Sequence, residues 1–164
     1  MRFIYQILIV IFIGFAPHSL AQDTTLNFQL SSDGWTIEQA LAEIEAYGLS
    51  GQVTDSSEST AAIEFEGATF AVDGYHCNSN KQCTEFLFYI GFDLPNGLSL
   101  DKVNEWNSTA IVGRAYLDDE QDPWLDHIIS VNDSNDDSAF REGLELWIAG
   151  LNNFNEFISS FWSS

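Results

Sequence analysis

Apolar and polar positions alternate first with the period of a helix and then with that of a strand. Before Gly48, apolar residues recur every three or four positions, which predicts an amphipathic helix. This stripe consists of Ile37, Ala40, Leu41, Ile44 and Tyr47. Thr36 and Gln39 have the spacing of a capping box, and Gly48 suits the left-handed conformation that ends a helix.

From residue 61 the period shortens to two. Apolar residues alternate with polar or small ones on both sides of Gly67, which predicts a β-hairpin. The alternating residues are Ile63, Phe65, Phe70 and Val72. The run 85–92 is apolar on both alternating faces, so we expect a central strand that is covered on each side.

The second half of the chain predicts a short helix and two more strands. A break at 95–97 and an N-cap at Ser99 precede a helix that reaches about residue 107. Strands are predicted at 110–117 and 124–131, around an acidic turn.

A long C-terminal helix has the strongest apolar stripe of the sequence. The stripe consists of Phe140, Leu144, Trp147, Ile148, Leu151, Phe154, Ile158, Phe161 and Trp162. Gly150 lies within it and is a candidate kink. The element order α-β-β-β-α-β-β-α predicts an α+β fold with an antiparallel sheet of about five strands flanked by helices.

The N-terminus has the three parts of a cleavable secretory signal. Arg2 precedes an apolar run, and the tripeptide Ser19-Leu20-Ala21 offers a cleavage site. The apolar run is shorter than the roughly 20 residues that span a bilayer, so a permanent anchor is the less favoured alternative. We expect a signal peptide at 1–21, a flexible lead at 22–33, a single domain at 34–164, and a periplasmic or secreted protein.

The chain is strongly acidic, with 25 acidic residues against five basic ones and a formal net charge of −20. Such a charge repels the phosphates of nucleic acids and anionic lipids. We therefore expect no nucleic-acid partner and no membrane insertion after signal cleavage. The charge either serves solubility or attracts a cationic partner.

Cys77 and Cys83 are the only two cysteines. In an oxidising compartment, cysteines this close are expected to form a disulfide, which would join neighbouring strands across the loop 78–82. A redox-active pair usually has the tighter C-x-x-C spacing, and a zinc site would need more ligands than the nearby His76. We predict a structural disulfide and no metal.

Candidate catalytic and metal-binding patterns are incomplete. The D-x-N-x-D segment at 133–137 resembles the start of a calcium loop, but Ser138 replaces the glycine of the turn and Leu144 the bidentate acid. The acidic turn 118–122 could hold a divalent ion weakly, although such turns are usually only solvated. The G-x-S-x-G pattern is missing, and His127 in a predicted strand is typical of a structural histidine. We expect no enzymatic activity and no cofactor.

Arg114 is one of few cations and lies beside Tyr116 in a predicted strand. Its guanidinium could pair with Glu105 or with an acidic turn residue, or it could recognise a ligand, because a planar fork suits both roles. Together with Trp106, these residues form the candidate binding or ion-pair site.

Two motifs together resemble the exported branch of the bacterial YbjN family. They are Cys77-x-x-x-Lys81-x-Cys83-Thr84 followed by Phe88-Tyr89-x-Gly91-Phe92, and Asn104-Glu105-Trp106-Asn107 followed by Gly113-Arg114-Ala115-Tyr116-Leu117-Asp118. The resemblance covers 36–157 and implies the fold of class I type III secretion chaperones, a small twisted antiparallel sheet flanked by helices. It also implies a role labelled sensory transduction regulation, with no known reaction, cofactor or catalytic residue. The stretch 108–112 is usually basic in relatives and is uncharged here, so an anionic contact there does not carry over.

These observations favour a non-enzymatic protein- or peptide-binding module that is chaperone-like or regulatory. A structural or envelope-stress accessory protein is the alternative, and a calcium-dependent or hydrolytic factor comes third. The sequence leaves the identity of the partner and the formation of a homodimer open.

Overall fold

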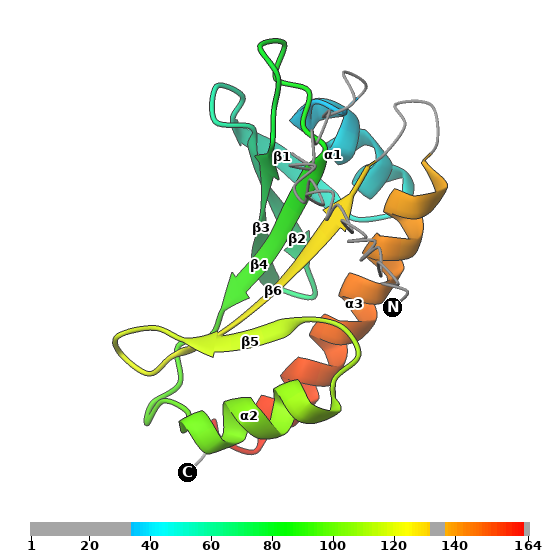
Figure 1. The fold of residues 1–164 in the computed structure, drawn as a ribbon. Coiled ribbons are helices and arrows are strands. Elements are labelled where there is room, and N and C mark those ends of the chain that lie inside the picture. Colours follow the sequence, from blue (N-terminus) through cyan, green and yellow to red (C-terminus); the bar gives the residue numbers. More distant parts are fainter. Residues whose placement is uncertain (1–33, 132–136, 163–164) are drawn as a thin grey trace, which may run out of the picture.

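The computed structural model describes residues 34–131 and 137–162. Its elements, shown in Figure 1, are α1 (Ile37–Ala46), β1 (Ser50–Asp55), β2 (Thr60–Phe65), β3 (Ala68–Tyr75), β4 (Glu85–Gly91), α2 (Leu100–Thr109), β5 (Arg114–Leu117), β6 (Pro123–Ser130) and α3 (Ser138–Ser159). The predicted signal peptide, the predicted lead and the first four positions of the calcium-like segment lie outside the described residues.

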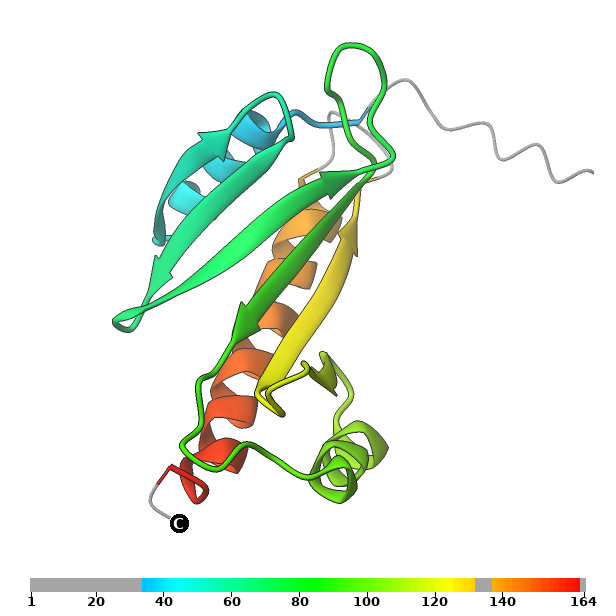
Figure 2. The same cartoon turned by 90° about the vertical axis from the view of Figure 1, so that its left-hand side faces the viewer.

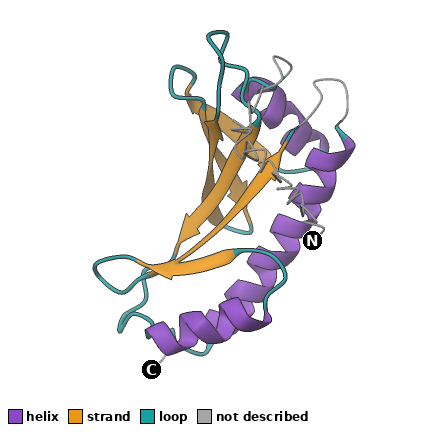
Figure 3. Cartoon of the chain, viewed as in Figure 1, coloured by secondary structure: helices purple, strands orange, loops and turns teal. Residues whose placement is uncertain are grey.

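The six strands form one antiparallel sheet in the order β1-β2-β3-β4-β6-β5. Helices α1 and α3 pack against one face, and α2 lies beside β5 at one end (Figure 3). The view in Figure 2 places the opposite face in front of both helices. The α+β class is confirmed, and the expected number of about five strands is corrected to six.

The additional strand is β1, which lies at the edge of the sheet and pairs only with β2. Its sequence is polar apart from Val53, so it has no alternating apolar pattern. The register shifts between Val53 and Asp55, which is typical of an edge strand with a bulge. This segment is a strand because it pairs with β2 and packs on α1. Both contacts depend on the folded structure, so the local sequence does not predict them.

The start of the domain follows the predicted pattern. Thr36 and Gln39 form the capping box of α1, and Gly48 ends the helix with a φ of 106°. Trp35, just before the cap, forms two backbone hydrogen bonds with Cys83 and is only 4% exposed. A Cβ at Gly34 would lie 2.5 Å from the Cys83 carbonyl oxygen, so the close approach of the two chains requires glycine there.

The core lies between α3 and the inner face of β3 and β4. The predicted stripe of α3 is buried from Phe140 to Ile158 except for the half-buried Ile148, whereas Trp162 at its end is 44% exposed. The Trp147 ring lies 5.6 Å from Phe70 and 6.0 Å from Phe88, measured between centroids. Such aromatic packing contributes more than the buried area alone.

Gly150, the candidate kink, lies in the middle of α3. Helix α3 runs through it as one element, and the residue is buried. A Cβ at this position would lie 3.4 Å from Val112, in the connection between α2 and β5. A Cβ there would make only an ordinary van der Waals contact, so the structure gives no steric reason for glycine at this position.

Two predicted strands differ from the observed ones. In β4, Phe86 and Phe88 are fully buried, whereas Leu87 and Tyr89 are only half-buried. The expectation that this strand is covered on both faces was wrong, because the helices cover one face only. The strand predicted from residue 110 begins at Arg114, since α2 continues to Thr109 and Gly113 has a φ of 83°.

Candidate functional site

The second family-like motif forms a corner between α2 and β5. The indole Nε1 of Trp106 donates a hydrogen bond to the Gly113 carbonyl at 3.2 Å. Its ring lies 4.9 Å from that of Phe154 and 5.7 Å from that of Phe157, and Trp106 is 7% exposed. Trp106 is thus a core residue that attaches α2 to α3.

Asn107 covers the outer edge of the sheet. Its side-chain amide donates to the Ala115 carbonyl at 3.0 Å and accepts from the Ala115 amide at 2.9 Å. The amide group thereby takes the place that a neighbouring strand would occupy. An exposed edge strand offers such groups to other chains, so Asn107 protects the middle of β5.

Arg114 forms an ion pair across β5 and β6, and its partner is Asp126. Its Nε donates to Asp126 Oδ1 at 3.1 Å, and a terminal nitrogen donates to Oδ2. The carboxylate side chain is 8% exposed and the guanidinium side chain 73%. Both predicted partners were wrong: Asp126 lies in β6 outside the acidic turn 118–122, and Glu105 accepts a hydrogen bond from Lys102 on α2 at 2.7 Å.

The register of the β5–β6 hairpin explains this pairing. The strands close at Leu117 and Pro123, so Arg114 lies opposite Asp126 and Tyr116 opposite Trp124. The side chains of directly opposed residues project to the same face of a sheet. The acidic turn therefore places one cation and one anion together on the face that the helices do not cover.

Three aromatic side chains from neighbouring strands lie side by side on this face. Tyr89 of β4, Trp124 of β6 and Tyr116 of β5 have centroid distances of 6.2 Å and 6.3 Å between consecutive rings. We call these three residues the aromatic row. The Arg114 guanidinium lies 5.5 Å from the Tyr116 centroid, so two of the predicted site residues do meet here.

Two contacts hold the centre of the row in place. Trp124 Nε1 donates to Asp118 Oδ2 at 3.0 Å. A Cβ at Gly91 would lie 2.7 Å from the indole, so glycine lets the ring lie close to β4. Asp118 also accepts from the backbone amides of Glu120 and Asp122. These hydrogen bonds, with that from Trp124 first, lower the pKa of Asp118 and give the acidic turn a structural role.

Tyr89 ends the row beside an acid. Its hydroxyl donates to Asp73 Oδ2 at 3.1 Å, across β3 and β4. Partial burial, followed by the negative charge of Asp73, raises the pKa of Tyr89 to about 12. The phenol is therefore neutral at physiological pH and acts as a donor.

The same face continues beyond the row with apolar side chains. Ile128 is 54% exposed and Tyr75 47% exposed, and the half-buried Leu87 lies opposite Ile128 in the register. We define the open face as the aromatic row together with Tyr75, Leu87 and Ile128. The sequence pattern alone missed most of it, although the second apolar face of the run 85–92 was a signal.

The disulfide lies at the end of this sheet. Cys77 and Cys83 are bonded, and they close the loop between β3 and β4 as predicted. Cys83 is fully buried and is the residue that pairs with Trp35. His76 Nδ1 lies 2.9 Å from a carboxylate oxygen of Glu85, so the nearby histidine has its own acidic partner.

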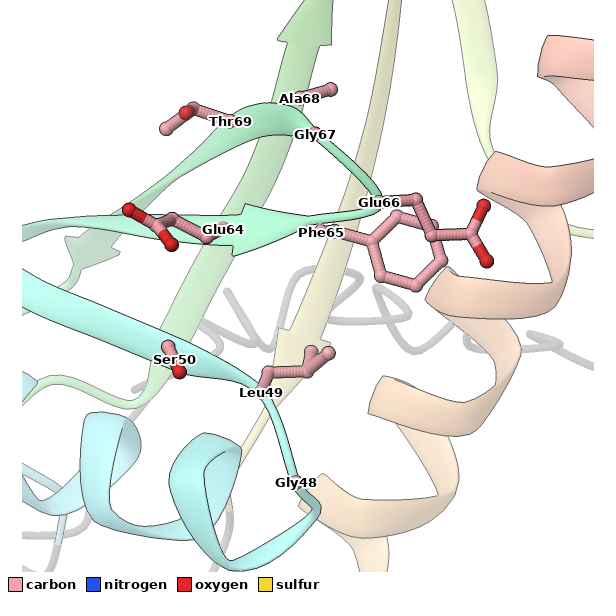
Figure 4. A pocket seen from close by; sticks show the side chains of 9 residues that line it. All are labelled: Gly48, Leu49, Ser50, Glu64, Phe65, Glu66, Gly67, Ala68 and Thr69. Carbon is pink, nitrogen blue, oxygen red and sulfur yellow. The ribbon is translucent and has the colours of Figure 1, made fainter.

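A hollow of about 630 Å³ lies elsewhere, between the end of α1 and the β2–β3 turn (Figure 4). It is lined by Gly48, Leu49, Ser50, Glu64, Phe65, Glu66, Gly67, Ala68 and Thr69. The carboxylates of Glu64 and Glu66 point away from each other. The hollow thus lacks the paired acids that acid–base chemistry requires.

Residues 34–131 and 137–162 contain neither a metal-ligand cluster nor a membrane-spanning helix. There, the structure brings no three histidine, cysteine or acidic side chains together as metal ligands. None of the helices in those ranges has the length and apolar character needed to cross a bilayer.

Comparisons with known proteins identify the fold and the family. The chain is similar to the Yersinia pestis type III secretion chaperone SycH, solved in complex with a stable fragment of YscM2. The TM-score is 0.50 at 16% identity, and the match covers 77% of this chain and 99% of SycH. No curated protein matches the chain. The family model described as a putative bacterial sensory transduction regulator matches residues 36–159, so the chain belongs to the YbjN family.

Proposed function

We propose that the protein is a non-enzymatic module of the periplasm or the secreted fraction that binds a protein or peptide on its open face. The open face carries the proposal, because large apolar and aromatic side chains are exposed there on a face that the described helices leave uncovered. Contiguous exposed apolar surface of this kind is typical of interaction sites. The role would be chaperone-like or regulatory.

The family and the fold support this proposal. The family model describes a regulator, and SycH, which shares the fold, was solved with a fragment of another protein.

A site-specific crosslinking experiment tests the binding role. A photoreactive amino acid replaces Ile128 on the open face, and a matched variant carries it at Glu145, which is exposed on α3. We expect a discrete protein adduct from position 128 and none from position 145 in the producing cell. Equal adducts at both positions, or none at position 128, would contradict the proposal. An adduct of twice the chain mass would identify a homodimer instead.

Export is tested separately. The N-terminal signal pattern and the disulfide support the proposed compartment. Sequencing the N-terminus of the protein from the periplasmic or culture fraction should give Gln22 as the first residue. An intact Met1 in a cytoplasmic fraction would contradict this part of the proposal.

A further inference from the structure

We propose that the open face recognises a basic polypeptide segment, with an arginine or lysine side chain of the partner against the aromatic row and near Asp73. This inference rests on the proposed function and names the chemistry of the partner. The evidence for it is the charges, the aromatic rings and the accessibility of the open face.

The charges on this side of the sheet are unbalanced. Arg114 is paired with Asp126, and His76 lies against Glu85. Asp73, whose hydrogen-bond partner among the described residues is the neutral phenol of Tyr89, projects from β3 to the same side. The surrounding chain has a formal net charge of −20. A cationic segment would meet a complementary field and an acid that forms no ion pair within the described part of the chain.

The aromatic row suits a cation. The face of an aromatic ring attracts ammonium and guanidinium groups, most strongly for tryptophan. Arg114 already shows the geometry, because its guanidinium lies 5.5 Å from the Tyr116 centroid while it pairs with a carboxylate. Asp73 beside Tyr89 offers the same combination of acid and ring at the other end of the row.

The apolar part of the open face suits the rest of such a segment. Neighbouring strands lie about 4.8 Å apart, and alternate side chains of an extended peptide lie about 7 Å apart. A basic side chain at the aromatic row would therefore leave neighbouring side chains within reach of Leu87 and Ile128. These two residues lie opposite each other on β4 and β6.

The probe is a blocked decapeptide with arginine and leucine in turn at every second position and serine between them, so that both side chains share one face. A counterpart with glutamate in place of arginine is the control. Binding to the whole mature protein is measured by titration at physiological salt, and amide chemical shifts map the contact. We expect the arginine peptide to bind and to shift the amides of Tyr89, Tyr116 and Trp124. Shifts spread over α3 and the acidic turn, or equal binding of the glutamate peptide, would overturn the inference.

Matched variants distinguish a specific binding site at Asp73 from general attraction to the acidic protein. Asp73→Asn keeps a hydrogen-bond acceptor for Tyr89, and Glu145→Gln removes the same charge from α3. We expect Asp73→Asn to weaken binding about tenfold and Glu145→Gln less than about twofold, because long-range charge is screened by salt. Tyr89 is the ring beside Asp73, so Tyr89→Leu should weaken binding about fivefold, and Tyr89→Phe should retain it. Equal weakening by the two acid variants would overturn the inference, and melting curves confirm that each variant folds.

Competition distinguishes failure of this inference from failure of the proposed function. Saturating arginine peptide should suppress the protein adduct formed from position 128. If the adduct persists, the open face binds a partner by other chemistry, and only the inference about basic segments fails. If position 128 forms no adduct and the arginine peptide does not bind the open face, both the proposed function and the inference fail.

Discussion

The exposed Arg114 stabilises the fold because its partner, Asp126, is buried. The carboxylate is almost completely covered, whereas the guanidinium is mostly in solvent. An exposed ion pair alone contributes little, because solvent screens it. A buried carboxylate without its partner is destabilising, since it retains a desolvation cost without compensating hydrogen bonds. The pair therefore stabilises the β5–β6 hairpin chiefly by satisfying Asp126.

The variant Arg114→Lys tests this role. Lysine keeps the charge but lacks the planar fork that contacts both carboxylate oxygens. We expect the free energy of unfolding to fall by about 1 kcal/mol, measured from denaturant midpoints. The matched control is Arg141→Lys, whose partners Glu43 and Asp137 are more exposed than Asp126 and which should cost less. Equal costs for the two variants would contradict a special role for the buried acid.

Tyr89 gives a prediction that depends on pH. Burial raises the pKa of its phenol from the ordinary value of 10.0 to about 12. Because the folded state holds the proton more tightly than the unfolded chain, this contribution to stability is complete below about pH 10 and is lost as the pH rises through about 12. The measurement is the unfolding free energy against pH. Tyr89→Phe should flatten the decline in this window, and an unchanged slope would contradict the assignment.

At the residue scale, the sequence predicted local pairs and missed distant ones. The capping box and the disulfide join residues three and six positions apart, so their spacing alone was sufficient. Arg114 had 25 acidic residues as candidate partners, and its pairing depends on the hairpin register. A turn centred on residue 120 would have placed Asp126 opposite Arg114. The pairing of Trp35 with Cys83 had no comparable signal.

At the element scale, α3 forms most of the helical side of the core. Its Trp147 is fully buried between Phe70 and Phe88, yet the indole Nε1 has no hydrogen-bond partner. The ring thus stabilises the domain by packing, and its polar atom opposes that contribution. The same helix exposes Leu146 on its other side, with 49% of the residue accessible.

Substitutions in α3 separate these contributions. Trp147→Ala should lower the free energy of unfolding by about 3 to 5 kcal/mol, because it leaves a large cavity. Trp147→Phe keeps a ring and removes the unpaired donor but leaves a smaller cavity, so it should cost about half as much as Trp147→Ala. The exposed control Leu146→Ala should change stability by no more than about 0.5 kcal/mol. A Trp147→Ala protein with unchanged thermal unfolding would show that the helix does not pack as described.

The disulfide constrains the loop between β3 and β4. Closing so short a loop stabilises the fold by about 2 kcal/mol on the chain-entropy estimate. The double variant Cys77→Ala, Cys83→Ala should lose that amount and still fold. Reductant should lower the denaturation midpoint of the native protein and leave that of the double variant unchanged. Mass spectrometry of the exported protein should find no free thiol, and two free thiols would contradict the prediction.

Elements with their own apolar pattern were predictable, and elements formed by their neighbours were not. Helix α3 and the β2–β3 hairpin have strong periodicity, so their existence followed from the sequence. Strand β1 has a polar sequence and depends on pairing with β2. The apolar outer face of β4 led us to expect a second covering layer. The exposed apolar residues of the open face therefore had the sequence pattern of buried ones.

At the scale of the whole molecule, repulsion among the acidic groups is the dominant long-range interaction. Few ion pairs of the described residues relieve it, and most of these lie at the surface, such as Lys102 with Glu105 and Arg141 with Glu43. Salt weakens both these attractions and the general repulsion. With 25 acidic residues against five basic ones, the repulsion outweighs the attractions. Screening should therefore stabilise the folded state.

We predict that raising NaCl from about 0.01 M to about 0.1 M raises the melting temperature, because the screening length falls from about 30 Å to about 10 Å. The opposite shift would mean that local ion pairs outweigh the net charge of −20. Calcium chloride at the same ionic strength is the control. If calcium acts only by screening, it should raise the melting temperature about as much as NaCl does. A saturable stabilisation at micromolar calcium would instead reveal a specific site and contradict the prediction that the chain binds no metal, because ligand binding raises stability by mass action.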